Sequence, residues 1–437
     1  MKRISLFLIT MFLFASFGLK AQNPPPAAPA TGATLNYTGL ENKLKKSDAE
    51  ILDAKKNIKA KTWTNRAQLL IDIFNINNDV LNVGMDQPSA KLFYKEPKEV
   101  QTMQEGADQI EILVYDRVNL KFRNGVLESW TETKKIHEDP LKEARRSLDE
   151  AIKLNTDGKA NSDITGVINN LKAAIEIDAI IAYEKKEFQK SYDGFMQILD
   201  LNKNPLMNNR IDTVDIYFAG RAALENKDYK EAVRLFELAS NYNYNDPFLY
   251  VFRKQALFAA GDTAAGVQVI NDGFNKYPNN QSIMIELINY YLVSNQSDEA
   301  LRLLSVAKAN DPKNVSYTFA EGTLYDKMGN FEEAEKAYKT CIEMQPDFYN
   351  GYYNLGVIYF NKAVKIYEDA SRISDNTEFE KLQAQGDEML KQAIPYMQKA
   401  SQIDPTDRFS LETLKTIFYR LKMNQEYQDV VNKLNAM

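Results

Sequence analysis

Three prolines recur at an interval of 34 residues, and this spacing constrains the fold more than any other feature of the chain. They are Pro278, Pro312 and Pro346. A period of roughly 20 to 50 residues is typical of solenoid proteins, in which each unit buries its apolar face against the next unit. The spacing therefore predicts a row of repeated units rather than one globular core.

Small residues recur in the same phase, twelve residues before each proline or its equivalent position. They are Ala232, Gly266, Ala300 and Ala334. A bulky residue follows four positions later, at Phe236, Ile270, Leu304 and Tyr338. Another small residue follows three positions after that, at Ala239, Gly273, Ala307 and Cys341. This spacing places one small residue per turn on a single helical face, so a neighbouring helix can approach closely.

Glycines mark the helix that precedes each of these faces. Gly220 and Gly322 stand twelve residues before a small residue, and Leu355-Gly356 is followed by Tyr359. From about Thr213 to Asp407 the chain resembles tandem tetratricopeptide repeats (TPRs). The fullest single match combines Gly322, Tyr325, Gly329, Phe331, Ala334, Tyr338 and Pro346. The resemblance implies an all-α fold, a TPR-type α-solenoid of stacked antiparallel helix pairs.

The phase of the repeats predicts the domain boundaries. We expect a signal peptide at 1–21, a Pro/Ala-rich linker at 22–40, a split N-terminal repeat at 41–158 with an insert at 75–139, a divergent TPR unit at 159–212, four TPR units in register at 213–348, a unit with extended helices at 349–407, and C-terminal capping helices at 408–437. The layout as a whole resembles exported TPR proteins of the bacterial envelope.

The first residues have the pattern of an export signal. Lys2 and Arg3 precede an uncharged, mostly apolar stretch from Ile4 to Leu19, and Ala21 offers a small residue for cleavage. An uncleaved membrane anchor is the alternative. However, this stretch is shorter than the roughly 20 residues that span a bilayer. We therefore expect an exported protein, periplasmic or envelope-associated, cleaved after Ala21 and without a transmembrane span thereafter.

The N-terminal repeat is predicted to be interrupted. Trp63, Ala67 and Leu70 have the spacing of a first repeat helix, whereas Ala144, Leu148 and Ala151 have that of a second. The insert between them contains Asn124-Gly125 flanked by two apolar runs, which is a strong signal for a β-hairpin. The sequence therefore predicts a small insert that contains a β-hairpin.

The unit at 349–407 is about 25 residues longer than its neighbours, because Pro405 lies 59 residues after Pro346. We expect Asn376 to end the first helix, and Thr377 with Glu380 to form a capping box for the second. About 12 additional residues in each helix would extend the pair by ~18 Å. The pattern predicts two prolonged antiparallel helices.

Residues suited to catalysis or metal binding are scarce. His137 is the only histidine and lies in a charged stretch, where a solvated surface position is expected. Cys341 is the only cysteine and occupies a packing position of a repeat. The segment from Gly261 to Gly266 lacks the Lys-Ser/Thr that follows a phosphate-binding loop. We expect no enzymatic activity, cofactor or metal site, although a working carboxylate pair stays possible in principle.

The TPR resemblance implies a concave groove lined by the first helix of each pair. Those positions here are Tyr217, Arg221, Val251, Gln255, Phe258, Asn289, Phe319, Thr323, Tyr353, Val357 and Phe360. An aromatic and aliphatic lining with a few amides suits a peptide segment or a partner helix. It lacks the Lys/Arg/Asn set that clamps a terminal carboxylate in some family members. The alternative is that these residues only pack one repeat against the next.

The favoured function is a non-enzymatic protein–protein interaction scaffold of the bacterial cell envelope. The formal net charge of −6 argues against nucleic acid as a partner, which leaves other proteins, especially envelope proteins. A glycan-binding or glycan-handling envelope protein that uses exposed aromatics, such as Trp63 or Trp130, is the alternative. The sequence leaves open the partner, the oligomeric state, and the choice between periplasm and cell surface.

Overall fold

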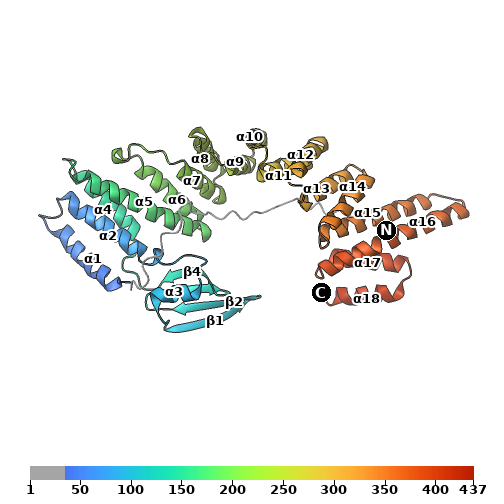
Figure 1. Ribbon diagram of the computed structural model, residues 1–437, viewed down its shortest axis with the longest axis horizontal. Coiled ribbons are helices and arrows are strands. Elements are labelled where there is room, and N and C mark those ends of the chain that lie inside the picture. Colours follow the sequence, from blue (N-terminus) through green and yellow to red (C-terminus); the bar gives the residue numbers. More distant parts are fainter. Residues whose placement is uncertain (1–34) are drawn as a thin grey trace. The chain divides into compact units, whose positions relative to one another are not determined.

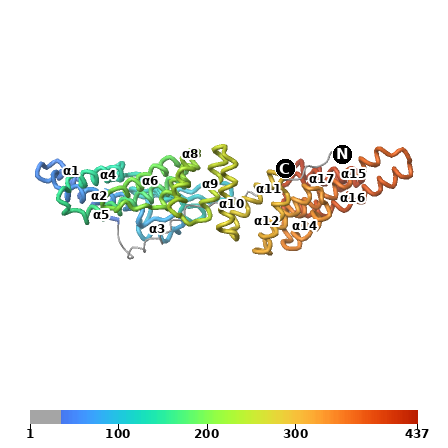
Figure 2. The backbone as a smooth tube through the Cα atoms, turned by 90° about the horizontal axis from the view of Figure 1, so that it is seen from above, coloured from blue at the N-terminus to red at the C-terminus, as the bar shows by residue number. Residues whose placement is uncertain are grey.

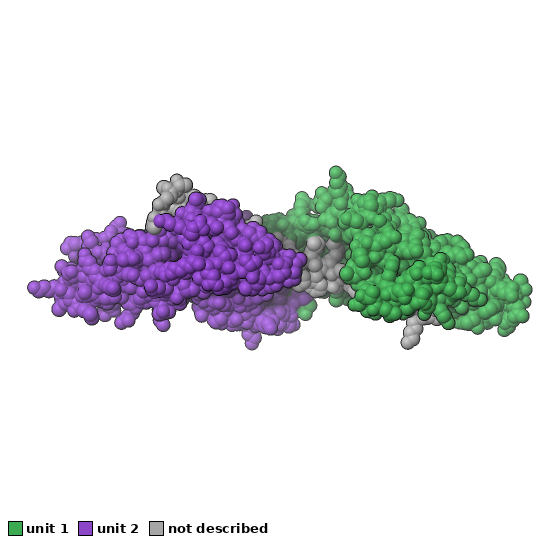
Figure 3. Space-filling view, turned by 90° about the horizontal axis from the view of Figure 1, so that it is seen from below, with its two compact units in different colours: residues 1–15, 246–254, 263–437 green, residues 16–245, 255–262 purple. Residues whose placement is uncertain are grey.

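A computed structural model describes residues 35–437 of the chain. The predicted signal peptide and residues 22–34 of the predicted linker lie outside the described residues. The described part divides into two compact units (Figure 3). The N-terminal unit comprises residues 35–245 and 255–262, and the C-terminal unit comprises residues 246–254 and 263–437.

The described residues form eighteen α-helices, one short 3-10 helix and four strands (Figure 1). This composition confirms the predicted fold class, a mostly helical solenoid of TPR type with a small β-containing insert. Helix α9 (Pro247–Ala259) contributes residues to both units.

The helices of the N-terminal unit follow one another along the chain, with the strands of the insert between α3 and α4. They are α1 (Tyr37–Leu52), α2 (Ala60–Asn78), α3 (Gln87–Tyr94), α4 (Pro140–Leu154), α5 (Asn161–Glu184), α6 (Phe188–Leu201), the 3-10 helix η1 (Pro205–Met207), α7 (Thr213–Glu225) and α8 (Tyr229–Asn241). Each helix from α4 to α7 packs against the next helix. Figure 2 shows this succession from above.

The first helix begins earlier than the sequence predicts. The side chain of Asn36 accepts a hydrogen bond from the backbone N–H of Gly39 at 2.8 Å, and α1 starts at Tyr37. An N-cap asparagine satisfies an otherwise unpaired N–H of the first turn. Residues 37–40 therefore belong to a helix, and assigning them to the linker was wrong.

The insert contains a four-stranded antiparallel sheet in the order β1-β2-β3-β4. The strands are β1 (Glu99–Glu105), β2 (Asp108–Val114), β3 (Val118–Arg123) and β4 (Val126–Glu132). The predicted hairpin is confirmed as β3–β4, and its turn residues Asn124 and Gly125 have φ values of 51° and 80°. The strands β1 and β2 were not predicted.

The helices on either side of the insert pack directly against each other, because α2 contacts α4. The predicted start of the insert at residue 75 was wrong, since α2 continues to Asn78. Helix α3 covers one face of the sheet (Figure 1). Its Ala90 and Phe93 pack with Leu120 and Phe122 of β3 in a core of the insert's own.

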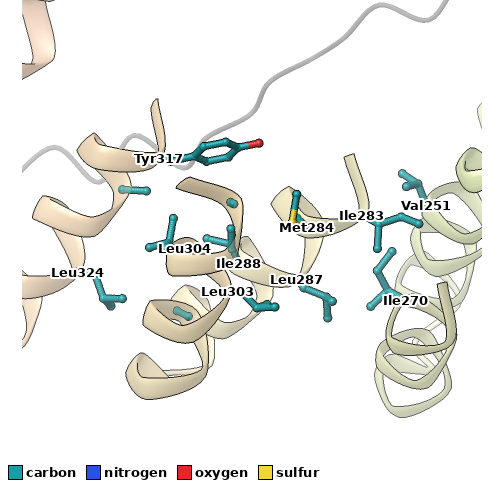
Figure 4. Close-up of a cluster of buried hydrophobic side chains, with 13 residues drawn as sticks. Val251, Ile270, Ile283, Met284, Leu287, Ile288, Leu303, Leu304, Tyr317 and Leu324 are labelled. Carbon is teal, nitrogen blue, oxygen red and sulfur yellow. The ribbon is translucent and has the colours of Figure 1, made fainter. Parts of the chain in front are cut away.

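The C-terminal unit continues the succession of helices. They are α10 (Thr263–Lys276), α11 (Gln281–Val293), α12 (Ser297–Asn310), α13 (Val315–Lys327), α14 (Phe331–Met344), α15 (Tyr349–Ala370), α16 (Asn376–Ile403), α17 (Arg408–Arg420) and α18 (Asn424–Asn435). Each helix packs against the next. One buried cluster runs from Val251 through Ile270, Met284 and Leu304 to Leu324, so its side chains come from five consecutive helices (Figure 4).

The small residues of the repeat lie where neighbouring helices meet. Ala300 and Ala334 are fully buried, as are Leu304 and Tyr338 one turn later. Burial of this face in successive units is the packing that the 34-residue spacing predicts.

The two long helices expected near residues 349–407 are present, with α15 spanning 22 residues and α16 spanning 28 residues. Gly386 of α16 lies against the ring of Tyr367 of α15, so the extended part of the pair is closely packed. The expected capping box at Thr377 and Glu380 was wrong. Asp375 caps α16 instead, because its carboxylate accepts the N–H of Glu378 at 2.8 Å.

Candidate functional site

Eight of the eleven predicted groove residues are buried side chains. They are Tyr217, Arg221, Val251, Phe319, Thr323, Tyr353, Val357 and Phe360. A buried side chain contributes mainly to helix packing unless a partner displaces its neighbours. The side-chain contacts of these residues therefore show whether they pack the helices together or face a groove.

Two of these residues make aromatic contacts within the N-terminal unit. The ring of Tyr217 stacks on Tyr244, with 4.7 Å between the ring centroids. The guanidinium of Arg221 donates to the hydroxyl of Tyr183 at 2.9 Å and lies 5.4 Å from the centre of that ring. Arg221 therefore links α7 to the end of α5, through a hydrogen bond and a cation–π contact.

Phe319 and Thr323 lie inside the α13/α14 pair. The ring of Phe319 is 5.7 Å from that of Tyr338 and 5.4 Å from that of Phe348. The hydroxyl of Thr323 donates to the carbonyl of Phe319 at 3.0 Å. This arrangement holds the two helices and the following loop together.

Tyr353, Val357 and Phe360 lie where α15 meets the helices that follow it. Tyr353 and Val357 share a cluster with Leu414 of α17, and Phe360 shares another with Ile417. Burial raises the pKa of Tyr353 to about 12. These contacts agree with the alternative interpretation, in which the predicted groove residues pack one repeat against the next.

The remaining predicted groove residues keep part of their surface. Gln255 is exposed, whereas Phe258 and Asn289 are half-buried. Gln255 and Phe258 belong to the N-terminal unit and Asn289 to the C-terminal unit. Binding in the groove stays a prediction. These three side chains keep part of their surface exposed, although the Oδ1 atom of Asn289 is buried.

The two residues best suited to nucleophilic or acid–base chemistry have packing or turn roles. Cys341 is buried, and burial raises the pKa of its thiol to about 12, so the reactive thiolate does not form near neutral pH. His137 accepts a hydrogen bond at Nδ1 from the N–H of Asp139, at 3.1 Å. Asp139 in turn caps α4. His137 therefore helps to shape the turn before that helix.

Two buried carboxyls were not singled out from the sequence. Burial raises the pKa of Asp326 to about 6, and its Oδ1 has no hydrogen-bond partner among the described residues. Burial, followed by the neighbouring charges of Asp212 and Glu176, raises the pKa of Asp215. The sequence gives no signal for either, because an aspartate is usually exposed and only the tertiary packing buries these two.

A cleft of about 730 Å³ lies within the N-terminal unit, between the sheet and the helices. We call it the insert cleft. Its lining includes Trp130 of β4, Phe74 of α2 and Ile181 of α5. The charges along it are paired locally: Lys121 lies 2.7 Å from Glu128, and Lys190 lies 2.8 Å from Asp178. Six acidic residues and five lysines line the cleft, so neither sign of charge dominates. It was not predicted, because its walls come from segments far apart in the sequence.

Both tryptophans make packing contacts. The indole N–H of Trp63 donates to the carbonyl of Asn57 at 2.7 Å, and Trp130 packs against the core of the insert. The glycan alternative, which requires exposed aromatic faces, is not favoured by these contacts.

Neither a metal centre nor a membrane span stands out in the part of the chain that the structure describes. Within residues 35–437, no three His, Cys, Asp or Glu side chains form a group that could hold a metal ion. No helix in this range combines the length and apolar character needed to cross a bilayer.

The helix pair α13/α14 contains a segment that matches a known family model. Residues 318–348 match the family model of the tetratricopeptide repeat. This segment is similar to a tetratricopeptide repeat. The match covers the close contact of Gly322 with Tyr338 and the buried Cys341, and it ends at Phe348, just before α15.

Solved structures of TPR proteins are similar to parts of this chain. One is YrrB, a TPR protein with an unusual peptide-binding site, at 18% identity over 41% of this chain and 88% of that chain, with a TM-score of 0.33. A TPR protein from Bacteroides fragilis matches at 21% identity over 56% of this chain and 97% of that chain, with a TM-score of 0.27. MamA from AMB-1 matches at 19% identity over 46% of this chain and 96% of that chain, with a TM-score of 0.32. No curated protein matches the sequence.

The TPR fold is typical of non-enzymatic interaction scaffolds. Its stacked helix pairs offer extended surfaces to other proteins. The fold thus suggests protein partners for this chain.

Proposed function

We propose that this protein is a non-enzymatic protein–protein interaction scaffold of the bacterial cell envelope. It binds a peptide segment or a helix of its partner along the first helices of its TPR pairs. The observation that carries the proposal is the row of packed helix pairs that includes the repeat at 318–348. A solenoid of this kind displays a long surface relative to its mass, which suits recognition of extended or helical segments.

The partly exposed groove positions are the contact points in this proposal. Phe258 supplies an aromatic surface, and Gln255 and Asn289 supply amide groups. The buried positions Tyr217, Phe319 and Tyr353 support the helices behind this surface. Within each unit, binding energy would then come from apolar contact and from hydrogen bonds to that unit's own amide group.

Export to the envelope rests on the sequence of residues 1–21. The basic Lys2 and Arg3, the apolar stretch that follows and the small Ala21 have the order of a secretory signal. Sequencing the N-terminus of the protein purified from its native envelope tests this part. The expected first residue is Gln22. A first residue of Met1, or recovery from the cytosol alone, would contradict export without affecting the scaffold proposal.

The binding proposal is tested by capture followed by direct affinity measurement. The tagged mature chain is incubated with envelope extract, captured proteins are identified by mass spectrometry, and the purified partner is titrated calorimetrically. Gln255→Arg and Asn289→Ala should each weaken binding about tenfold or more, which corresponds to about 1.4 kcal/mol.

Gln268→Arg is the matched control for Gln255→Arg. Gln268 is also an exposed glutamine, but it lies on α10, the second helix of its pair. Its substitution should leave affinity unchanged. Equal losses at Gln255 and Gln268, or no loss at Gln255 and Asn289, would contradict binding along the first helices. Buried positions such as Phe319 are unsuitable, because truncating a buried aromatic costs about 3–5 kcal/mol of stability.

A further inference from the structure

We propose that strand β1 of the insert is a second interaction surface, which accepts an extended basic segment of another protein as a fifth strand. This surface is separate from the helical groove. It uses backbone pairing at the edge of a sheet rather than side-chain contacts between helices. The exposure, pairing and charge of residues 99–105 support this assignment.

The edge strand is open along its whole length. All seven residues from Glu99 to Glu105 are exposed. The strand pairs with β2 in an unbroken register, from Glu99 opposite Val114 to Glu105 opposite Asp108. Among the residues that the structure describes, β1 has no strand on its other side. The N–H and C=O groups of alternate residues therefore point outward without a backbone partner.

The opposite edge of the same sheet is covered. The N–H of Leu127 in β4 donates to the carbonyl of Met85 at 2.7 Å, and the N–H of Gly84 donates back to the carbonyl of Leu127 at 2.9 Å. Asp86 and Val126 form a further bridge. Within residues 35–437, backbone pairing thus protects part of the β4 edge, whereas the outer edge of β1 has no backbone partner.

Strand β1 itself lacks several of the usual protections of an edge strand, although Pro97 and Lys98 directly precede it and a glutamate stands at each end. Natural edges carry charged side chains, especially lysine, or a proline or a bulge that prevents addition of another strand. The segment Glu99–Glu105 contains no lysine or proline, and its pairing with β2 has no bulge. Val100 and Met103, on opposite faces, are 51% and 45% exposed. An added strand would bury both apolar side chains while pairing the free backbone.

The glutamates at the two ends of β1 indicate which kind of strand could pair with its free edge. If two copies of this chain paired β1 with β1 antiparallel over all seven residues, Glu99 of each would lie opposite Glu105 of the other. Like charges directly opposite each other destabilise a strand pair. A segment with Lys or Arg six residues apart would instead place a cation opposite each carboxylate. Arg123 already contacts Glu105 at 2.7 Å, so Glu99 is the stronger anchor of the two.

The probe is the capped peptide Lys-Val-Val-Thr-Val-Val-Lys with a fluorescent label, titrated with the full mature protein and followed by fluorescence anisotropy. We expect saturable binding that is lost when both lysines of the peptide are replaced by glutamate. Absence of saturable binding, or equal binding of the glutamate form, would overturn the proposal. Neither outcome bears on the helical groove.

Backbone methylation separates strand addition from other modes of binding. In a strand, the N–H groups of alternate residues face the neighbouring strand. Methylating the amide nitrogens of the second, fourth and sixth peptide residues, or of the third and fifth, should therefore give unequal results. One set should weaken binding at least tenfold, and the other should leave it nearly unchanged. Equal effects of both sets would overturn the proposal, and this test needs no protein variant.

Protein variants locate the surface. Met103→Lys should weaken binding of the lysine peptide at least tenfold. Val126→Lys is the matched control, because Val126 has the same 45% exposure but lies on the covered β4 edge. Unchanged affinity for Met103→Lys would overturn the assignment to β1.

Sedimentation of the protein alone tests whether a second copy occupies the edge. It should show no dimer that depends on β1. A dimer that Met103→Lys dissociates would mean that a second copy, not a basic partner, occupies the edge.

Discussion

Gly322 of α13 lies against the ring of Tyr338 of α14. A Cβ atom at position 322 would stand 2.8 Å from Cε1 of that ring, and 3.1 Å from Cβ of Ala337. Similar contacts recur between Gly220 and Phe236 and between Gly356 and Met397. A small residue in the first helix of a pair therefore receives a large residue from the second, and this contact sets how closely the two helices approach.

Gly322→Ala should destabilise the C-terminal unit by about 1–3 kcal/mol, because overpacking outweighs the gain in helix propensity. Urea unfolding followed by far-UV circular dichroism measures the change. Gly166→Ala is the control, since Gly166 lies within α5 and a Cβ atom added there would have no neighbouring atom within 4 Å. It should be neutral or stabilising by up to about 1 kcal/mol. Equal behaviour of the two variants would show that the close contact has no energetic role.

Asp326 should make the stability of the C-terminal unit depend on pH. Burial raises its pKa from 3.8 to about 6, so the folded state binds the proton more tightly than the unfolded state does. This contribution favours folding below about pH 4 and is lost as the pH rises through about 6. Relative to the native protein, Asp326→Asn should therefore gain stability between pH 4 and pH 7, by about 2 kcal/mol.

The exposed Asp347 provides the control for this pH dependence. The difference in unfolding free energy between native protein and Asp347→Asn should stay nearly constant over the same range. If Asp326→Asn showed the same constant difference, its buried carboxyl would have no part in the pH dependence.

Cys341 should resist thiol reagents in the folded protein. It is fully buried, and its raised pKa keeps the thiol neutral. A reagent that releases a coloured thiolate should react with no thiol in native buffer and with one thiol per chain in guanidinium, because this is the only cysteine. Rapid reaction in native buffer would point to an accessible, activated thiol and would weaken the non-enzymatic interpretation.

Asn77 should control how firmly the insert is attached to the helices. Its side-chain oxygen accepts hydrogen bonds from the hydroxyls of Tyr37 and Tyr94, the latter at 2.7 Å, and its amide donates to Glu132. Asn77→Leu would remove the hydrogen bonds that these half-buried groups make to the amide, at a cost of about 0.5–1.5 kcal/mol each. Hydrogen exchange should become faster in β3 and β4 and stay unchanged in α7 and α8. Uniform faster exchange would instead indicate general unfolding.

The repeated features of the sequence predicted the repeated features of the fold. The spacing of Ala300 and Ala334 identified a buried helical face, and Asn124-Gly125 identified the β3–β4 turn, because each signal depends on local backbone geometry. Strand β1 escaped prediction because both of its faces are exposed, so Glu99–Glu105 lacks the alternation of apolar and polar residues that marks a half-buried strand.

The candidate site was harder to predict than the fold. Helical spacing indicates which face of α15 carries Tyr353 and Val357, but not how closely α17 covers that face. Likewise, no local pattern could bring Lys121 and Lys190 to one cleft, since contacts between distant segments create it. The start of α16 was also mispredicted. Asp375 and Thr377 can both cap a helix chemically, and only the geometry of the chain selects Asp375 as the N-cap.

Helix pairs 34 residues apart should stack as equivalent units, and deleting one pair tests this most directly. Removing residues 315–348 takes out α13 and α14 and joins Asn314 to Tyr349, so the phase of the remaining helices is kept. We predict a soluble protein with cooperative unfolding, as expected for a solenoid with nearest-neighbour contacts. Removing residues 331–348 alone takes out α14 and should abolish cooperative folding. If both deletions fold equally well, or both fail equally, the helix pair is not the structural unit of this protein.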